Sequence, residues 1–339
     1  MSLGDVNLGC ALALVHELVR GGMQHACISP GSRSTPLALA LDRHPSVTTH
    51  VHLDERSGAF FALGIAKAAG KPVGVACTSG TAAAELFPAV VEASQSRVPL
   101  VLLTADRPPR LRGTGANQTI DQVELYGTYA RAYVEPPVPA SDADVESWRR
   151  AGERAIDAVR PVPGPVHLNL PFDEPLVPSN GAATSPSQTS LRSRSRSRVD
   201  VSLENGDRFA REVSGARGMA VVGGWTGDLS GVTRFFTEGL KWPVLAEPTS
   251  GIRTPGVALA AGQALMSSSA WLDRHRPELV VQLGATPTTQ APAPETMRSA
   301  VPGPAPSAHA PRPSTVPFYL AIFVMVTALT GLVWILALA

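Results

Sequence analysis

Short apolar segments alternate with longer helical patterns through residues 1–177. Strands that are apolar throughout are typical of a parallel sheet covered by helices on both faces. The pattern therefore predicts an α/β fold built on a parallel sheet, with Asp5 capping its first helix. Strands are expected at residues 26–28, 47–51, 73–77, 100–103 and 166–170. Helices are expected at residues 5–19, 37–41, 55–69, 82–93 and 145–159.

A second α/β pattern occupies residues 201–290 and predicts part of a further domain. Its strands are expected at residues 218–222, 244–246 and 278–283, and its helices at residues 232–239 and 258–266. Residues 178–200 are rich in Ser and Arg and too polar to bury a core, so we interpret them as a solvated linker. Binding of RNA or acidic lipid by this Arg-Ser run is the alternative.

The C-terminal part changes character twice. Residues 291–315 are rich in Pro and Ala and predict a tether. Residues 316–339 contain no charged side chain, and a helix of this length, at about 1.5 Å per residue, spans the ~30 Å core of a bilayer. We therefore expect a single membrane-spanning helix, with the α/β domains in the cytoplasm. A buried core helix is the alternative.

The bulk composition narrows the class of protein. The formal net charge is +1 over 339 residues, so no global field favours nucleic acid. Cys10, Cys27 and Cys77 are far apart in apolar contexts, and we interpret them as small buried hydrophobic residues. No basic segment followed by an apolar core marks a signal peptide at the N-terminus. The chain is expected to be a globular protein of a reducing compartment.

Polar motifs follow the predicted strands one after another. Because ligands of parallel sheets bind outside the carboxyl ends of the strands, these motifs predict a binding site at one edge of the sheet. The first motif, a donor-rich turn with one fixed cation, suits a carboxylate. The motifs are Ser29-Pro30-Gly31-Ser32-Arg33-Ser34, Asp54-Glu55, Thr78-Ser79-Gly80-Thr81 and Ala105-Asp106-Arg107-Pro108.

Together with Gly115-Ala116-Asn117-Gln118, these motifs resemble the pyrimidine-binding domain of a thiamine-diphosphate enzyme family. That family comprises the menaquinone-pathway synthases of 2-succinyl-5-enolpyruvyl-6-hydroxy-3-cyclohexene-1-carboxylate. The resemblance is strong in the first domain, partial in the middle domain, and covers residues 5–290. It implies a thiamine-diphosphate-binding fold for residues 1–177 and a transferase that joins decarboxylated 2-oxoglutarate to isochorismate.

The resemblance also implies roles for single residues. Glu55 would be the catalytic acid on the pyrimidine ring of thiamine diphosphate. Thr78, Ser79, Gly80 and Gln118 would join Glu55 in binding the cofactor. Ser32, Arg33, Arg107, Asn117 and Gln118 would bind the substrates, both of which carry several carboxylates.

Two of these roles have plain structural alternatives. Glu55 in the first turn of a helix is also stabilised by the helix dipole. Arg107 also suits a structural ion pair with Asp106 or another neighbour. Related carboligases of other specificity resemble this segment too, but they usually carry Thr-Ser-Gly-Pro-Gly where this chain has Thr78-Ser79-Gly80-Thr81-Ala82.

The family binds the cofactor's diphosphate through Mg²⁺, using a Gly-Asp-Gly segment followed by Asn, and residues 1–339 contain no Gly-Asp-Gly. We therefore expect a truncated member of the family that lacks the metal ligands and is inactive alone. A homo-oligomer would lack the same ligands, so activity would require a complementing chain. The alternative is a non-catalytic, membrane-tethered remnant or fusion.

Overall fold

The computed structural model describes residues 2–159, 162–179, 213, 215–224, 229–253, 256–259, 262–266, 268–284, 323–327 and 332–336. The chain forms two compact units, Met1–Arg196 and Ser197–Ala339, and each is described by itself. The predicted linker from residue 180 onward and the tether at residues 291–315 lie outside the described residues.

The first unit is built on a six-stranded sheet in the order β2-β1-β3-β4-β6-β5. Every pairing in it is parallel. The predicted parallel-sheet α/β fold is therefore confirmed. The strands are β1 (His25–Ile28), β2 (Thr48–Val51), β3 (Val73–Cys77), β4 (Leu100–Asp106), β5 (Tyr133–Val134) and β6 (Val166–Pro171).

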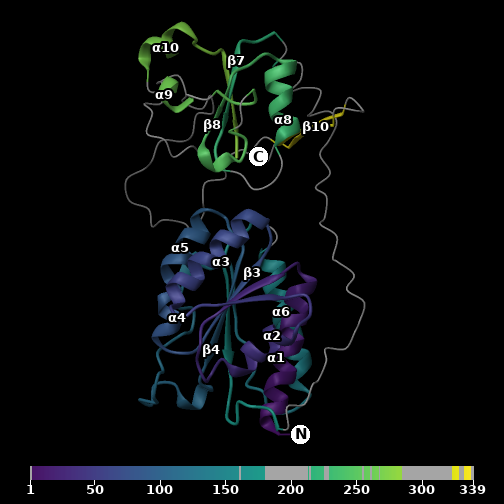
Figure 1. The fold of residues 1–339 in the computed structure, drawn as a ribbon, viewed down its shortest axis with the longest axis vertical. Coiled ribbons are helices and arrows are strands. Elements are labelled where there is room, and N and C mark those ends of the chain that lie inside the picture. The colour runs from purple at the N-terminus through teal and green to yellow at the C-terminus, as the bar shows by residue number, and fades with distance from the viewer. Residues whose placement is uncertain are drawn as a thin grey trace, which may run out of the picture. The chain divides into compact units, whose positions relative to one another are not determined.

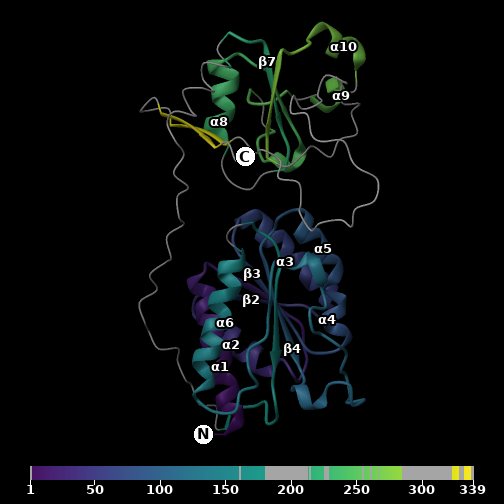
Figure 2. The same ribbon diagram turned by 180° about the vertical axis from the view of Figure 1, so that it is seen from behind.

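Helices cover both faces of this sheet (Figures 1 and 2). One face is covered by α1 (Leu3–Arg20), α2 (Thr35–Arg43) and α6 (Asp144–Val159). The other face is covered by α3 (Glu55–Ala69), α4 (Thr81–Glu85) and α5 (Phe87–Gln95). The two cores divide neighbouring strand residues between them: Val75 and Cys77 face α3, whereas Ala76 faces α1. This division explains why the strands are apolar at successive positions.

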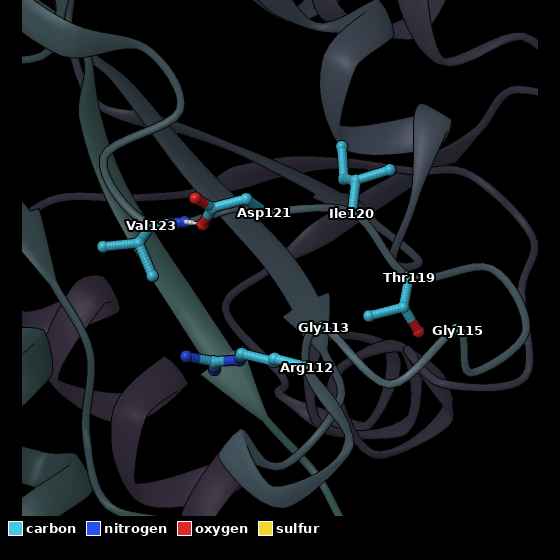
Figure 3. A pocket seen from close by; sticks show the side chains of 7 residues that line it. All are labelled: Arg112, Gly113, Gly115, Thr119, Ile120, Asp121 and Val123. Carbon is cyan, nitrogen blue, oxygen red and sulfur yellow. Dashed lines mark hydrogen bonds between the residues drawn. The ribbon is translucent and has the colours of Figure 1, made fainter.

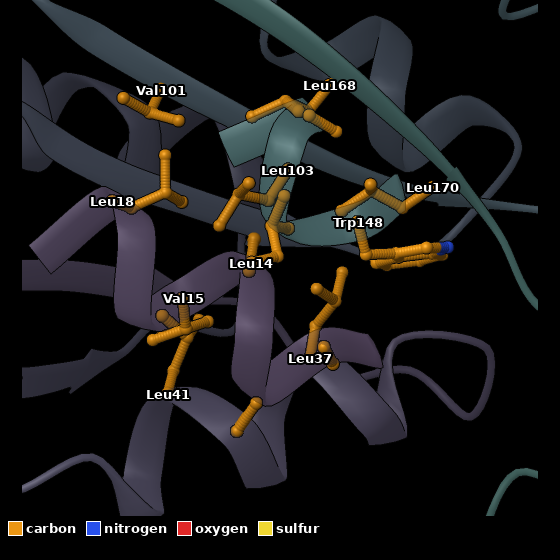
Figure 4. Packing of buried hydrophobic residues seen from close by; sticks show 14 of the residues in the cluster. Leu14, Val15, Leu18, Leu37, Leu41, Val101, Leu103, Trp148, Leu168 and Leu170 are labelled. Atoms are coloured by element: carbon orange, nitrogen blue, oxygen red, sulfur yellow. The ribbon is translucent and has the colours of Figure 1, made fainter. Parts of the chain in front are cut away.

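Figure 4 shows the packing on the α1 face. Leu14 and Leu18 of α1 are fully buried against the sheet residues Val101 and Leu103. Truncating a leucine buried in this way to alanine typically costs about 2–5 kcal/mol. The central strands are therefore held in place from this side by α1 as well as by their own ladder.

Local signals set the ends of the helices. Ser2 is the N-cap of α1: its hydroxyl oxygen accepts the Asp5 N–H, and the Asp5 carboxylate accepts the Ser2 N–H in a capping box. The prediction of Asp5 as the cap was therefore wrong by three positions. Asp54 caps α3 by accepting the Ser57 N–H at 2.7 Å, and Gly70 ends this helix with a left-handed φ of 61°.

The single helix predicted at residues 82–93 is two helices, α4 and α5, that meet at Leu86. Pro88 lies near the start of α5, where a missing N–H is tolerated, but it cannot continue α4. The sequence prediction also missed β5 and the short 3-10 helices Pro109–Leu111 and Gly127–Tyr129. Elements of two or three residues are too short to show a periodicity.

The second unit contains a three-stranded parallel sheet in the order β8-β7-β9. Its strands β7 (Gly218–Val222), β8 (Val244–Ala246) and β9 (Leu279–Leu283) lie at or within one residue of the predicted segments. The helix expected at residues 232–239 is α8 (Ser230–Arg234) followed by a wider helical turn, Phe235–Gly239. Other helical elements among the residues described in this unit include a 3-10 turn (Pro248–Ser250), α9 (Gly262–Met266) and α10 (Ser269–Arg274).

The predicted membrane-spanning helix at residues 316–339 is wrong. Within that segment, β10 (Phe323–Thr327) and β11 (Leu332–Leu336) pair as antiparallel strands. Over the part of the chain that the structure describes, no helix is long and apolar enough to cross a membrane. The membrane location with cytoplasmic α/β domains, which depended on this helix, is corrected with it. The segment is rich in Val, Ile and aromatic residues, which favour strands, and an apolar run alone does not separate helix from strand.

Candidate functional site

The predicted site residues follow four neighbouring strands of the first unit. The chain leaves β1 toward β2 on one side, and β3 lies on the other side of β1. The loops after β1 and β3 therefore flank a topological switch point, where parallel sheets open a crevice for ligands. Ser32 and Arg33 follow β1, Glu55 follows β2, Thr78, Ser79 and Gly80 follow β3, and Arg107 follows β4.

Two glycines allow the loops to approach each other closely. A Cβ added at Gly31 would lie 2.3 Å from the Cβ of Thr78, which is closer than real Cβ atoms come to another atom. Gly80 has φ 84° and ψ −144°, a conformation that L residues rarely adopt, and a Cβ there would lie 3.0 Å from the side chain of Gln118. The loop after β3 is therefore enclosed by the loops that contain Gly31 and Gln118.

Arg107 joins the loops into one cluster. Its Nη1 donates to Ser79 Oγ at 2.6 Å, and its Nη2 donates to the Asn117 carbonyl at 2.8 Å. Ser79 Oγ in turn donates to the Gln118 carbonyl at 3.0 Å. Four of the predicted site residues are thus brought together by hydrogen bonds, and we call these four the Arg107 cluster.

The alternative interpretation of Arg107, an ion pair with Asp106, does not describe this geometry. Asp106 is fully buried and forms its ion pair with Arg112 at 2.9 Å, while Asp106 Oδ1 accepts only the backbone N–H of Arg107. The Arg107 guanidinium makes no ion pair within the described residues. Burial, and secondly the charge of Arg33, lower the pKa of Arg107, while the charges of Asp106 and Glu174 act in the opposite direction.

Arg33 provides a second buried cation near the Arg107 cluster. Its Nη1 donates to the Phe172 carbonyl at 3.0 Å, and its Nη2 pairs with Glu174 at 2.9 Å. The Arg33 side chain is 7% exposed, and that of Glu174 is 70% exposed. Arg33 Nε is buried without a hydrogen-bond partner, so one strong donor is left unused. Two buried guanidinium groups with spare capacity make this region attractive to an anion.

Glu55 lies apart from these hydrogen bonds. It is the first residue of α3 and is half-buried. Burial, and secondly the charge of Glu55, raise the pKa of the Cys77 thiol at the end of β3. In the sheet, β1 lies between β2, which Glu55 follows, and β3, which Thr78 follows. A carboxylate in this position also gains from the helix dipole, so the geometry is compatible with both interpretations of Glu55.

Three of the remaining predicted residues are open to solvent. Ser32, Asn117 and Gln118 are exposed, while Thr78 is buried. Asn117 and Gln118 join the Arg107 cluster through their carbonyl groups, and Gln118 has a left-handed φ of 53°. Their side chains are consequently available for contacts with a ligand.

A polar network lies behind the Arg107 cluster, and the sequence analysis missed it. Asn169 Nδ2 donates to Asp106 at 2.9 Å and to Glu135 at 3.0 Å, and Arg112 pairs with both carboxylates. Gln122 extends the network toward the loop after β3. These residues come from separate segments of the chain, so no local motif marks them.

A pocket of about 450 Å³ is formed by the loop on either side of Asn117 and Gln118. Figure 3 shows the Arg112 side chain at this pocket, and the Asp121 carboxylate accepting the Val123 N–H at 3.0 Å. The volume is in the range of small-molecule sites. The lining residues are Arg112, Gly113, Gly115, Thr119, Ile120, Asp121 and Val123.

Comparison with known families identifies the first unit. Residues 10–125 match the family model described as thiamine pyrophosphate enzyme, N-terminal TPP binding domain. These residues carry the N-terminal TPP-binding domain of the thiamine-diphosphate enzyme family. The matched residues include Glu55, the two buried arginines Arg33 and Arg107, and the loop after β3.

The most similar curated proteins include several named 2-succinyl-5-enolpyruvyl-6-hydroxy-3-cyclohexene-1-carboxylate synthase. This chain is 46% identical to the protein of that name from Thermobifida fusca over 285 residues, which are 82% of this chain and 51% of the relative. The identity is 42% over 311 residues for Haloquadratum walsbyi and 43% over 288 residues for Chloroflexus aurantiacus. The chain spans about half the length of these relatives.

Proposed function

We propose that the first unit forms the pyrimidine side of a thiamine-diphosphate site and binds the carboxylates of 2-oxoglutarate and isochorismate. The observation that supports this most directly is the pair of buried guanidinium groups, Arg107 without a carboxylate partner and Arg33 with an unused Nε. Burying such cations is costly unless an anion arrives. A multiply carboxylated substrate supplies that anion in the bidentate form that arginine prefers.

The residues present fit the pyrimidine half of the cofactor. Gly31 and Gly80 allow backbone to approach where side chains would collide, and Glu55 is a half-buried acidic residue at the start of α3. Bound thiamine diphosphate supplies the carbon nucleophile for decarboxylation and carboligation of a 2-oxo acid. Glu55 would hold a proton at the pyrimidine N1′, and Thr78, Ser79, Gly80 and Gln118 would line the ring.

The substrate side would be formed by the remaining predicted residues. Arg33 and Arg107 would orient the carboxylates, and the exposed side chains of Ser32, Asn117 and Gln118 would contact the bound molecule. The synthase names of the relatives support this pairing of cofactor and substrates.

The groups that hold the diphosphate are proposed to come from elsewhere. Within the described residues, no group of three or more His, Cys, Asp or Glu side chains could hold a metal ion. We propose that carboligation requires ligands from another chain, and that residues 1–339 alone are inactive. A homo-oligomer and a complementing chain both stay predictions, as do the boundaries 1–177, 178–200, 201–290 and 291–315. A fragment of another thiamine-diphosphate carboligase and a non-catalytic remnant or fusion of this family are the alternatives.

Titration of the full chain with 2-oxoglutarate tests the anion site, using calorimetry on wild type and Arg107→Gln. Loss of one charge-assisted contact, about 1.5–3 kcal/mol, weakens binding by roughly 10–100-fold. Arg217→Gln is the matched control, because Arg217 is an exposed arginine of the second unit paired with Glu278. Equal binding by wild type and Arg107→Gln would contradict the proposal.

A second titration with thiamine diphosphate and Mg²⁺, followed by a carboligation assay, separates the remaining possibilities. We expect weak cofactor binding and no product from this chain alone. Product formation by the isolated chain would overturn the requirement for a second chain, and binding of neither cofactor nor 2-oxoglutarate would favour the non-catalytic alternative.

A further inference from the structure

Gln122 is a fully buried side chain with hydrogen bonds to three separate segments. Its Nε2 donates to the Ala105 carbonyl at 3.2 Å and to Asn169 Oδ1 at 2.9 Å. Its Oε1 accepts the backbone N–H of Gly80 at 2.9 Å. The side chain therefore links β4, β6 and the loop after β3.

The orientation of the Gln122 amide follows from its neighbours. Asn169 Nδ2 donates to two carboxylates, Asp106 and Glu135, so Asn169 Oδ1 must face the other way as an acceptor. Only the NH₂ of Gln122 can bond that oxygen, which leaves Gln122 Oε1 for the Gly80 N–H. The sheet thus determines which atom Gln122 presents to the loop.

Gly80 directly follows Ser79, the central residue of the Arg107 cluster. Its left-handed backbone carries the chain from Ser79 into α4, and Ser79 Oγ connects Arg107 with the Gln118 carbonyl. Gln122 is only four residues beyond Gln118 in the chain. Its hydrogen bond to Gly80 therefore fixes the end of the Gln118 loop to the same Gly80 turn that the Gln118 side chain covers.

We propose that Gln122 is a positioning residue, which holds the Gly80 turn and the Gln118 loop in the geometry that lets Arg107 present its guanidinium to a carboxylate ligand. This role rests on the proposed function. The hydrogen bond from Gly80 to Gln122 is independent of that function and is tested separately.

The test compares amide hydrogen exchange at Gly80 with 2-oxoglutarate binding in the full chain. In wild type, the Gly80 amide exchanges slowly, because it is buried and bonded to Gln122. Gln122→Met keeps the length of the side chain but removes its donors and acceptor. We expect Gly80 to exchange about 10-fold faster and 2-oxoglutarate to bind about 10-fold more weakly, as expected from the loss of one buried hydrogen bond.

Thr104→Val is the matched control. Thr104 is fully buried and donates to the same Asn169 Oδ1 at 3.0 Å, and its other side-chain partners, His167 and Leu168, lie on β6 rather than in the Gly80 loop. This variant loses stability while Gly80 protection and ligand binding stay at the wild-type level. If Gln122→Met acted only by weakening the core, Thr104→Val would change Gly80 exchange and 2-oxoglutarate binding to the same extent.

Three results would overturn the proposal. The first is a Gly80 amide that exchanges in wild type as fast as the exposed Gly115 amide, a measurement that needs no variant to fold. The second is unchanged Gly80 exchange in Gln122→Met. The third is equal loss of binding in Gln122→Met and Thr104→Val. Absence of 2-oxoglutarate binding in wild type would instead contradict the proposed function, and Gly80 exchange would still test the contact with Gln122.

Discussion

Arg107 and Arg112 are five residues apart in the same loop, yet their surroundings are opposite. Arg112 pairs with Asp106 and Glu135, both at 2.9 Å, and its side chain is 17% exposed. Arg107 is buried against the Ser79 hydroxyl and the Asn117 carbonyl, which are neutral acceptors. The charge of Arg112 is compensated by two carboxylates of the protein, whereas the guanidinium of Arg107 has no carboxylate within ion-pair distance among the described residues.

This difference separates a structural cation from a binding cation. A buried ion pair holds segments together, and removing one of its partners leaves a charge without compensation. A buried cation with neutral partners is a cost in the free protein that a bound anion removes. Sequence alone does not distinguish the two arginines, because each lies near Asp106 in the chain.

Removing the Asp106 carboxylate, which pairs with Arg112, has the largest expected effect on stability. Asp106→Ala removes the fully buried one of the two carboxylates that Arg112 and Asn169 share, and we expect a loss of about 3–5 kcal/mol of unfolding free energy. Arg107→Met, in contrast, changes stability by less than about 1 kcal/mol, because no paired carboxylate is left behind. Urea unfolding followed by amide exchange in α1 and α6 measures both. Equal losses in the two variants would erase the distinction between the arginines.

The second prediction concerns His167, which belongs to the same buried polar region and is fully buried. It lies 2.8 Å from Thr104 Oγ1, and burial lowers its pKa from 6.5 to about 3. Between these two values the unfolded chain binds a proton that the folded chain does not. Its contribution to stability is therefore complete above pH 6.5 and is lost as pH falls toward 3, by about 1.4 kcal/mol per pH unit.

Unfolding free energies measured from pH 6.5 to pH 5 check this slope. His167→Phe is expected to flatten it, because phenylalanine suits the apolar contacts with Tyr126 and Tyr133 and does not titrate. His275→Asn, a change at an exposed histidine of the second unit, should keep the wild-type slope. An unchanged slope in His167→Phe would show that another group titrates in this range.

The smallest expected effect concerns Glu174, the exposed partner of Arg33. Glu174→Gln removes a carboxylate that competes with a ligand for Arg33. Such pairs contribute at most about 1 kcal/mol, so we expect a small loss of stability and roughly 3-fold tighter binding of 2-oxoglutarate. Glu146→Gln, which alters an exposed ion pair on α6, is the control and leaves calorimetric binding unchanged. Weaker binding in Glu174→Gln would mean that Glu174 supports the site.

The apolar pattern was sufficient for most of the architecture. Segments such as residues 73–77 are apolar throughout because their side chains alternate between two cores, one under α1 and one under α3. This is a local consequence of a sheet covered on both faces, so a single sequence shows it. The break between α4 and α5 at Leu86 is also a local effect, because Pro88 in the first turn of α5 cannot continue α4.

The same kind of pattern was misleading at residues 316–339. An apolar run without a period contains no information on whether backbone groups bond within one helix or between two strands. The paired strands β10 and β11 required contacts between residues at opposite ends of the segment. A prediction based on composition and length alone therefore selected the wrong element.

The sequence by itself determined the parallel-sheet fold and the end of the sheet where the polar motifs gather, because both follow from local patterns and from the direction of parallel strands. Tertiary structure alone decided which groups bond there. It placed Asp106 on Arg112 rather than on Arg107, left Arg33 Nε without a partner, and brought Gln122 to Gly80. These outcomes depend on burial and on distances between segments far apart in the chain, which no local pattern records.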